Sequence, residues 1–390
     1  GSPVAVAGSV EERHGIILAK NILAKSCGVQ TGEPIWKARK KCPGLICLPP
    51  DFERYMRFSS QVRDIYARYT DKIEPFGLDE AWLDVSQCGR GGEEMADLFR
   101  DIVREEMGVT ISVGVSFNKV FAKLGSDMKK PDATTVISRE NFREKVWPLP
   151  AEELLYVGRA TKRKLNRVGI FTIGEIARAD RTLLRMLLGK WGDTLGTYAR
   201  GEENAPVLRM GESAAVKSIG NSMTPPRDLL CPRDAELMFY VLAESVAARL
   251  RAHGLRCGGV VISVRDCELQ TYTRQKRLRK PTNLSGEIAG LAMELFCASY
   301  HWERPVRSVG VAGFHLTGED REVQLCCLDD GSAERARNAQ MESAVDEIRR
   351  RFGQKAVMRG ALLGTPFGAL NPKEENIIYP AGFQETPDVW

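Results

Sequence analysis

The sequence predicts a multidomain protein of mixed α and β structure, in the α/β or α+β class. Its 390 residues exceed what one hydrophobic core usually organises, so roughly two to four domains are expected. In the first half, strands and helices alternate around an acidic segment, Gly77–Val85. In the second half, residues 217–318 follow the order strand, helix, strand, strand, helix, strand, which predicts a sheet with two helices on one face.

The composition is that of an ordinary globular protein, with 27% charged and 43% hydrophobic residues. The net charge of +5 is only a weak indication of a polyanionic partner. The ten cysteines include no Cys-x-x-Cys spacing and no Cys–His cluster, which argues against a zinc site. With no signal peptide visible, we expect reduced thiols and a cytoplasmic location. No apolar run approaches the length of a membrane span, so we expect no membrane partner. Separately, we expect a monomer.

Short elements are expected over the first seventy residues. Gly28 is expected to end the first helix, and Trp36 to lie on the apolar face of the second. Lys20 and Lys25 are interpreted as charged, solvent-exposed residues of the predicted helix. The expected elements are a buried strand over Pro3–Ala7, a strand that continues as a helix over Gly15–Lys25, and helices over Glu33–Cys42 and Asp51–Asp71.

Two adjacent carboxylates, Asp79 and Glu80, are the chemical centre of the acidic segment. Neighbouring side chains of a regular strand point to opposite faces, so these two can share a site only where the strand ends. Pro75 and Gly77 supply that irregularity. Mg²⁺ is a cation that one or two carboxylates hold together with substrate phosphates. The segment therefore predicts either a metal site for phosphoryl transfer or an exposed hairpin turn, where Asp and Glu are common.

The residues that follow predict a helix over Met95–Glu106 and an alternating strand over Val109–Val115. We expect this strand to pair with the strand around Leu83, and Ser116 to cap the next helix. Lys129 and Lys130 lie at the exit of that helix, where the helix dipole favours cations. The alternative is a lysine directed at a triphosphate held by the metal site.

Two stretches of the second half have features of DNA binding. Leu154–Leu165 followed by Val168–Ile170 has helix–hairpin–helix character, in which Gly158 permits a tight turn. Free N–H groups at the start of the next helix, from Arg159 to Thr161, can bind a phosphate of duplex DNA. The alternative is an ordinary glycine turn between helices.

The predicted strand Leu269–Leu278 and its exit are strongly basic, with Tyr272 among the cations. Basic residues on an open sheet face suit a phosphate backbone, and such binding is strongly salt-dependent. The alternative is a solvated edge strand that its charges protect. The candidate DNA-binding residues of this unit are Lys217, Ser218, Arg274, Lys276, Arg277 and Arg279.

Three ordered motifs resemble the palm of the Y-family (translesion) DNA polymerases, in the form found in bacteria. They are Gly77–Asp84, Ser112–Lys123 and Ser126–Pro131, and the likeness extends from Pro3 to about Leu362. The resemblance implies a right-hand architecture. Its expected parts are fingers with a residual palm strand (1–72), palm (73–147), helix–hairpin–helix thumb (148–208), linker (209–216), βαββαβ little finger (217–318), and a clamp-motif-like segment, C-terminal helix and mobile tail (319–390).

The resemblance also implies the chemistry. In the family, three carboxylates hold two Mg²⁺ ions roughly 3.5–4 Å apart, one activating the primer 3′-hydroxyl and the other escorting the triphosphate. Asp79 and Glu80 match two of the three ligands, and Lys130 matches the palm lysine that contacts the triphosphate. The implied partners are primer–template DNA and a deoxynucleoside triphosphate.

The sequence departs from the family at two places. The third carboxylate, and the aromatic residue that excludes ribonucleotides, lie in the family on a strand before Pro3–Ala7, so we expect a strand upstream of this sequence. The family's Tyr-x-Ala-Arg is here Ile22–Lys25. Lys25 keeps a charge for the triphosphate but lacks the bidentate fork of Arg.

A further resemblance concerns Gln324–Asp330, which is similar to the Gln-Leu-x-Leu-Phe peptide that engages the sliding clamp. Gln324 and Leu325 match that peptide, whereas Leu328 replaces its aromatic anchor and Cys327 a leucine. The segment predicts either weak clamp docking or a plain linker.

The leading functional hypothesis is template-directed synthesis across damaged DNA by two-metal nucleotidyl transfer. The rival is a catalytically impaired or inactive DNA-binding factor on a Y-family scaffold, since the strand with the first metal ligand is missing from this sequence. A nuclease that uses the same acid pair with Mg²⁺ is a third possibility, which only the acid pair favours.

Overall fold

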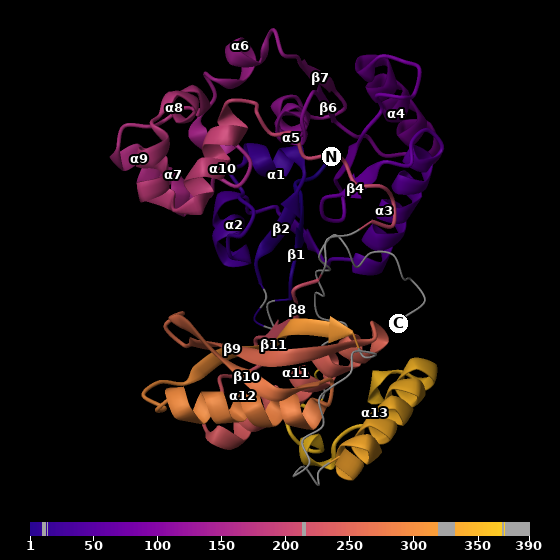
Figure 1. Cartoon of the computed structure of the whole chain (residues 1–390), viewed down its shortest axis with the longest axis vertical. Helices are drawn as coiled ribbons and strands as arrows, with labels where there is room; N and C mark the ends of the chain where they lie inside the picture. The colour runs from indigo at the N-terminus through magenta and orange to yellow at the C-terminus, as the bar shows by residue number, and fades with distance from the viewer. Residues whose placement is uncertain (10–12, 14, 213–215, 319–331, 369, 371–390) are drawn as a thin grey trace. The chain divides into compact units, whose positions relative to one another are not determined.

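In this computed structural model of the chain, residues 1–9, 13, 15–212, 216–318, 332–368 and 370 are described (Figure 1). They form two compact units: residues 1–52 with the described part of 214–378, and residues 53–213. Both units combine helices with sheets, which confirms the mixed α/β multidomain class. The finer division into fingers, palm, thumb, linker and little finger stays a prediction. The second unit also takes in most of a helix that was predicted as part of the fingers.

A three-stranded sheet in the order β2-β1-β3 organises residues 1–52. Its central strand β1 (Val4–Ala7) pairs antiparallel with β2 (Ile17–Lys20) and parallel with β3 (Ile46–Leu48). The helices α1 (Ile22–Ser26) and α2 (Ile35–Lys41) follow β2, as the sequence predicts.

The predicted orientation of α2 is wrong. Trp36 is 60% exposed, with the Lys40 ammonium 5.0 Å from its ring. Ile35 and Ala38 are buried instead. Residues three apart share one helix face, and this short helix turns only that one face to the core.

The second unit begins with the elements around the acidic segment. β4 and β5 form an antiparallel hairpin, whereas β6 and β7 form a parallel pair joined through α5. The elements are α3 (Phe52–Ala67), β4 (Ile73–Pro75), β5 (Ala81–Leu83), α4 (Gly92–Met107), β6 (Val113–Ser116), α5 (Lys119–Met128) and β7 (Thr134–Ile137).

Two predictions for this region are wrong. The strand predicted over Val109–Val115 begins only at Val113 and pairs with β7 rather than with the Leu83 strand. Alternation predicts a strand but does not select its partner, which the α5 crossover places here. The N-cap of α5 is Asn118, whose Oδ1 accepts a hydrogen bond from Phe121 N at 2.8 Å. The Ser116 hydroxyl donates to the Ile137 carbonyl instead.

A set of short helices completes the second unit. Gly158 has φ −79°, which any residue adopts, so the turn does not use the conformational freedom of glycine at this position. The left-handed positions are Tyr156 (φ +69°), just before α7, and Gly169 (φ +79°), just after it. The elements are α6 (Phe142–Val146), η1 (Ala151–Glu153), α7 (Arg159–Arg167), α8 (Ile173–Arg178), α9 (Arg181–Leu188) and α10 (Lys190–Ala199).

Residues 218–318 form the predicted βαββαβ unit. Its four strands lie in the order β10-β9-β11-β8, and α11 and α12 cover one face of the sheet (Figure 1). Val260, Ile262 and Val264 of β9 are fully buried beneath these helices. The elements are β8 (Ser218–Met223), α11 (Pro232–Ala252), β9 (Leu255–Asp266), β10 (Thr271–Thr282), α12 (Ser285–Ser299) and β11 (Val306–Gly318).

The predicted C-terminal helix is α13 (Ser332–Phe352), followed by η2 (Gln354–Ala356) and η3 (Gly360–Leu362). Ion pairs attach α13 to the helical layer, among them Arg349–Glu244 at 2.8 Å. Phe367 is 1% exposed, so the first residues of the predicted mobile tail pack against the protein. The clamp-like residues Gln324, Leu325 and Leu328 lie outside the described residues.

Candidate active site and DNA-binding surface

The two predicted metal ligands lie together in the turn of the β4–β5 hairpin. Phe76 N donates to the Glu80 carbonyl at 2.8 Å and closes the turn. Gly77 has φ +81°, a conformation that favours glycine. The Ser59 hydroxyl of α3 donates to the Leu78 carbonyl. The acidic segment is therefore a hairpin turn, which is one of the two predictions. The turn also brings both carboxylates to one tip, which the alternative prediction of a metal site requires.

The two carboxylates differ in their surroundings. Asp79 is exposed, and it makes no ion pair with any residue that the structure describes. The Glu80 side chain is 34% exposed and pairs with Lys123 of α5, Oε1 to Nζ 2.9 Å. Lys123 also pairs with Asp127 at 2.6 Å. Burial lowers the pKa of Lys123, but its hydrogen bonds to Asp127 and Glu80 outweigh this and raise the pKa above the ordinary value. Lys123 is therefore a firmly charged ammonium beside the acidic turn.

A second acid–lysine pair fixes the hairpin to α5. Glu74 of β4 pairs with Lys119, Oε2 to Nζ 2.5 Å, and accepts a hydrogen bond from Leu208 N at 2.9 Å. Trp82 of β5 donates from Nε1 to the Lys119 carbonyl at 2.9 Å. The hairpin is thus held on one turn of α5, and Lys123 lies on the next turn.

The predicted triphosphate-binding lysines lie in different units. Lys130 follows α5, is exposed, and pairs with Asp127 at 2.7 Å. Asp127 therefore links Lys130 to Lys123 and the acidic turn. Lys25 is exposed in the last turn of α1, within the unit that contains residues 1–52. Gly158 and Arg159 are exposed at the start of α7, whereas Thr161 is half-buried.

The basic strand β10 divides its cations between the two faces of the sheet. Arg277 stands opposite Gly259 in the sheet. A Cβ on Gly259 would meet the Phe314 ring, which lies on the open face, so Arg277 lies on the open face as well. Lys276 stands opposite the buried Val260 and pairs with Glu294 of α12 at 2.5 Å. Arg274 also takes the helix-facing register, and its guanidinium lies 5.1 Å from the Tyr272 ring. Lys217 and Ser218 are exposed at the start of β8, and Arg279 is exposed beyond the regular pairing.

Small and hydroxylated residues form part of the open face of this sheet. One row across all four strands consists of Thr273, Ser263, Gly310 and Ser222, paired in register. A Cβ on Gly310 would come within 2.5 Å of the Ser263 hydroxyl, so the row has no room for a larger side chain there. This row is therefore low and polar, while the same face also carries Val261, Arg265 and Phe314, with Arg277 near its edge.

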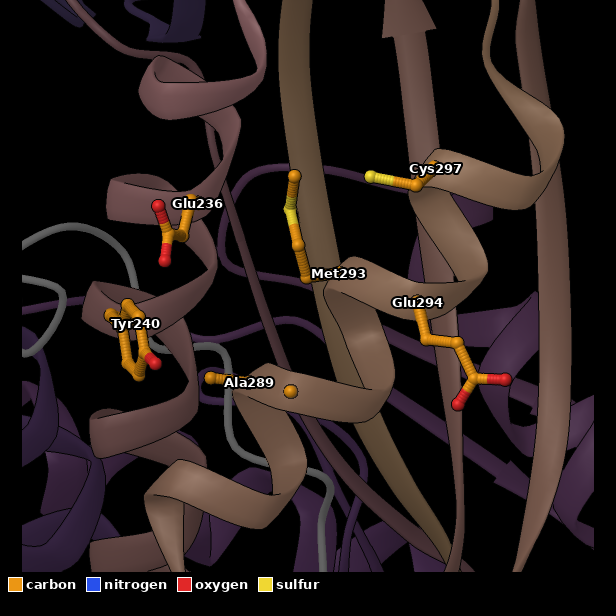
Figure 2. A pocket seen from close by; sticks show the side chains of 7 residues that line it. Glu236, Tyr240, Ala289, Met293, Glu294 and Cys297 are labelled. Carbon is orange, nitrogen blue, oxygen red and sulfur yellow. The ribbon is translucent and has the colours of Figure 1, made fainter.

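Two hollows among the described residues bear on the choice of site. One, of about 380 Å³, lies between α11 and α12 and is lined by Glu236 and Tyr240 of α11 and Ala289, Met293, Glu294 and Cys297 of α12 (Figure 2). It contains none of the predicted active-site residues. The other, of about 510 Å³, lies between α5 and the segment before α7. It includes Lys123, Asp127 and Tyr156, and so adjoins the acidic turn.

The described residues contain no group of three or more His, Cys, Asp and Glu side chains arranged to hold a metal ion. Asp79 and Glu80 supply hard carboxylate oxygens at an accessible tip, which is the donor type of Mg²⁺. Lys123 keeps Asp127 as a partner if Glu80 turns to a cation. The pair therefore fits an ion whose remaining ligands come from substrate phosphates or water.

Comparison with known proteins identifies the family. Residues 1–127 match the model of the impB/mucB/samB family, and residues 216–325 match that of the impB/mucB/samB family C-terminal domain. A DNA polymerase IV of Acetivibrio thermocellus is 48% identical over 364 residues, which cover 93% of this chain and 91% of the relative. This chain belongs to the Y family of DNA polymerases. DNA polymerase IV 1 of Bacillus subtilis is another relative of this Y-family chain, 35% identical over 93% of the chain and 87% of the relative.

Solved Y-family structures agree with this assignment. A Y-family DNA polymerase chimera of Dbh and Dpo4 has a TM-score of 0.70 at 25% identity, over 81% of this chain and 92% of the chimera. DinB from Sulfolobus solfataricus has a TM-score of 0.54 at 25% identity, over 80% and 92% of the two chains. The predicted family and right-hand fold class are thereby confirmed, and this Y-family chain is a DNA-directed DNA polymerase. No helix among its described residues is long and apolar enough to span a membrane.

The sequence interpretation of the Y-family motifs missed two contributors. Lys123 is the last residue of one motif, and the sequence predicts no role for it, yet it neutralises Glu80. Glu74 was not singled out, although it joins the hairpin to Lys119. The available signal was the spacing of Lys119 and Lys123, which are four residues apart and so share one face of α5.

Proposed function

We propose that this polymerase copies DNA past damaged template positions by nucleotidyl transfer at Asp79 and Glu80, with two Mg²⁺ ions. The observation that supports this is the placement of both carboxylates at one hairpin tip, beside the charged Lys123. Neither carboxylate is buried, so the tip is accessible to a triphosphate. The resemblance of the sequence motifs to the translesion polymerases adds the expectation of synthesis across lesions.

The side chains divide the work by charge. Asp79 and Glu80 would hold the ions, which when bound offset negative charge on the reacting phosphates. Lys130, which Asp127 links to the acidic turn, would neutralise the triphosphate, and a contact from Lys25 stays a prediction from the sequence. Lys123 would exchange Glu80 for its second partner Asp127 as an ion arrives, so no buried charge is left unpaired.

Primer extension tests the assignment. Asp79→Ala and Glu80→Ala should each lower extension in Mg²⁺ by at least about 100-fold. Both variants should retain primer–template affinity. Asp101→Ala is the matched control, because Asp101 is a 64% exposed carboxylate of α4 whose ion-pair partner is Arg104. Undiminished extension by either site variant would contradict the assignment.

We also propose that the open face of the β8–β11 sheet binds the DNA backbone. Its low row of hydroxyls and glycine lets a phosphate approach the sheet closely, and Arg277 supplies charge. Arg277→Ala should weaken DNA binding and lower the slope of log Kd against log salt by about one. Lys276→Ala is the control, since Lys276 is paired with Glu294 on the other face. Equal effects of the two substitutions would contradict a binding surface confined to the open face.

A second candidate function is a DNA-binding factor with little catalysis. It is favoured by the absence of a three-carboxylate cluster among the described residues and by lysine at position 25. On this hypothesis the chain binds primer–template DNA but extends no primer in Mg²⁺ or Mn²⁺. Extension by the chain as it stands would exclude this second function.

Clamp docking through Gln324, Leu325 and Leu328, a monomeric state and a cytoplasmic location stay proposals. A double substitution of Leu325 and Leu328 to Ala should abolish retention on an immobilised sliding clamp. Light scattering should give the mass of one chain.

A further inference from the structure

Tyr156 has a backbone conformation that tyrosine rarely adopts. It lies in the turn between η1 and α7 with φ +69°, in the left-handed region. For a residue with a Cβ this region costs free energy, whereas glycine adopts it freely. A strained residue in a turn that glycine would satisfy points to a function for its side chain.

The Tyr156 ring is held in place yet accessible. Its centroid lies 5.5 Å from that of Trp191 and 6.4 Å from that of Phe76, both in edge-to-face geometry. Tyr156 is nevertheless 51% exposed, and Trp191 is 39% exposed. The contacts therefore orient the ring without covering it, which is the arrangement of a stacking platform.

The ring also lies close to the acidic turn. Phe76, its neighbour, is the residue whose N–H closes that turn on Glu80. Tyr156 lines the 510 Å³ hollow together with Lys123, which pairs with Glu80. A ligand on the ring would thus lie beside the residues that we propose hold the reacting groups.

The lining of the hollow suits a nucleobase on the ring. Of its carboxylates, Asp127 pairs with Lys123 and Lys130, and Glu152 pairs with Lys162, so much of their charge is neutralised. A nucleobase presents a π-face to the exposed ring and amino groups to carboxylates such as Glu153.

We propose that Tyr156 is a positioning residue that stacks on an unpaired nucleobase of the primer–template, next to the duplex. This inference rests on the proposed polymerase function and adds a residue to it. Tyrosine is then kept at this position despite the left-handed strain, because a glycine would relieve the strain but remove the stacking surface.

The test uses the full chain and a primer–template with 2-aminopurine at the first unpaired template position, read by fluorescence and by anisotropy. Tyr156→Leu should keep the strain and bulk but lose the π-face. We expect its affinity for this DNA to fall at least about fivefold and the 2-aminopurine fluorescence of the complex to rise. Tyr156→Phe should behave as the unchanged chain does. Tyr69→Leu is the control, because Tyr69 is also a 38% exposed tyrosine with an edge contact, to Phe99 at 5.4 Å.

Two outcomes would overturn the inference. In one, Tyr156→Leu binds the DNA and quenches 2-aminopurine as the unchanged chain does. In the other, Tyr156→Gly unfolds at a lower temperature while affinity and fluorescence stay unchanged, which is the signature of a purely structural ring. Both readouts are taken without triphosphate, so they are independent of extension. If the unchanged chain extends no primer, the proposed function fails while the stacking result still stands.

Discussion

Glu342 of α13 is a carboxylate whose removal should open one part of the structure. It is 9% exposed and accepts hydrogen bonds from Ser285 N at 3.0 Å and from the Ser285 hydroxyl at 2.7 Å. It therefore caps the N-terminus of α12 from another helix, where the helix dipole favours an anion. It also pairs with Arg251 of α11. A single side chain thus joins three helices.

The magnitude follows from these contacts. Glu342→Ala leaves the Ser285 N–H without an acceptor, and such a loss of hydrogen bonds to a charged group costs about 1.5–3 kcal/mol. Breaking a buried ion pair costs about 3–5 kcal/mol when the other charge is left alone. Arg251 keeps Asp346 at 2.7 Å and the Asn283 carbonyl at 2.7 Å, so that penalty is reduced. We expect a total loss of about 3–4 kcal/mol.

Amide hydrogen exchange of α13 and of the first turn of α12 measures this loss where it occurs. The control is Glu347→Ala, on the same helix, because its ion-pair partners among the described residues are Arg350 and Arg351 at the surface. Such exposed pairs contribute about 0–1 kcal/mol. If the two variants lowered the opening free energy to within about 0.5 kcal/mol of each other, the account of Glu342 as a buried cap would be wrong.

Three further predictions concern single positions. Gly114→Ala should destabilise by about 3 kcal/mol or more in urea unfolding, because its Cβ would lie 1.9 Å from the Ala122 carbonyl oxygen; a wild-type midpoint would contradict this. Gly290→Ala, in the exposed interior of α12 with nothing within 4 Å of the added Cβ, should instead stabilise by about 0.5–1 kcal/mol in thermal unfolding. Hydrogen bonds from Lys72 and Ser86 lower the pKa of Asp84 to about 2 from 3.8. Because the pKa of Asp84 is lower in the folded state, this stabilisation is complete above about pH 4 and is lost as the pH falls toward 2. Asp84→Asn should therefore reduce the difference in unfolding free energy between pH 6 and pH 2, measured by urea titration, by about 1–2 kcal/mol.

Local patterns in the sequence were sufficient for much of the fold. Periodicity predicted the βαββαβ order of residues 217–318, and Pro75 with Gly77 predicted the turn that carries Asp79 and Glu80. These features depend on near neighbours, because a helix, a strand or a turn is specified mainly by residues a few positions apart. The motifs that indicate the family are local in the same sense.

Contacts between distant residues were decided only by the tertiary structure. The sequence did not show that Lys123 neutralises Glu80, that Val113–Ser116 pairs with β7, or that Trp36 points to solvent. Strand alternation separates Arg277 from Lys276, but only the placement of α11 and α12 decides which of the two is on the open face. The left-handed turn at Tyr156 likewise contradicts local preference. Each outcome depends on which surfaces pack together, and packing free energy is summed over partners that lie far apart along the chain.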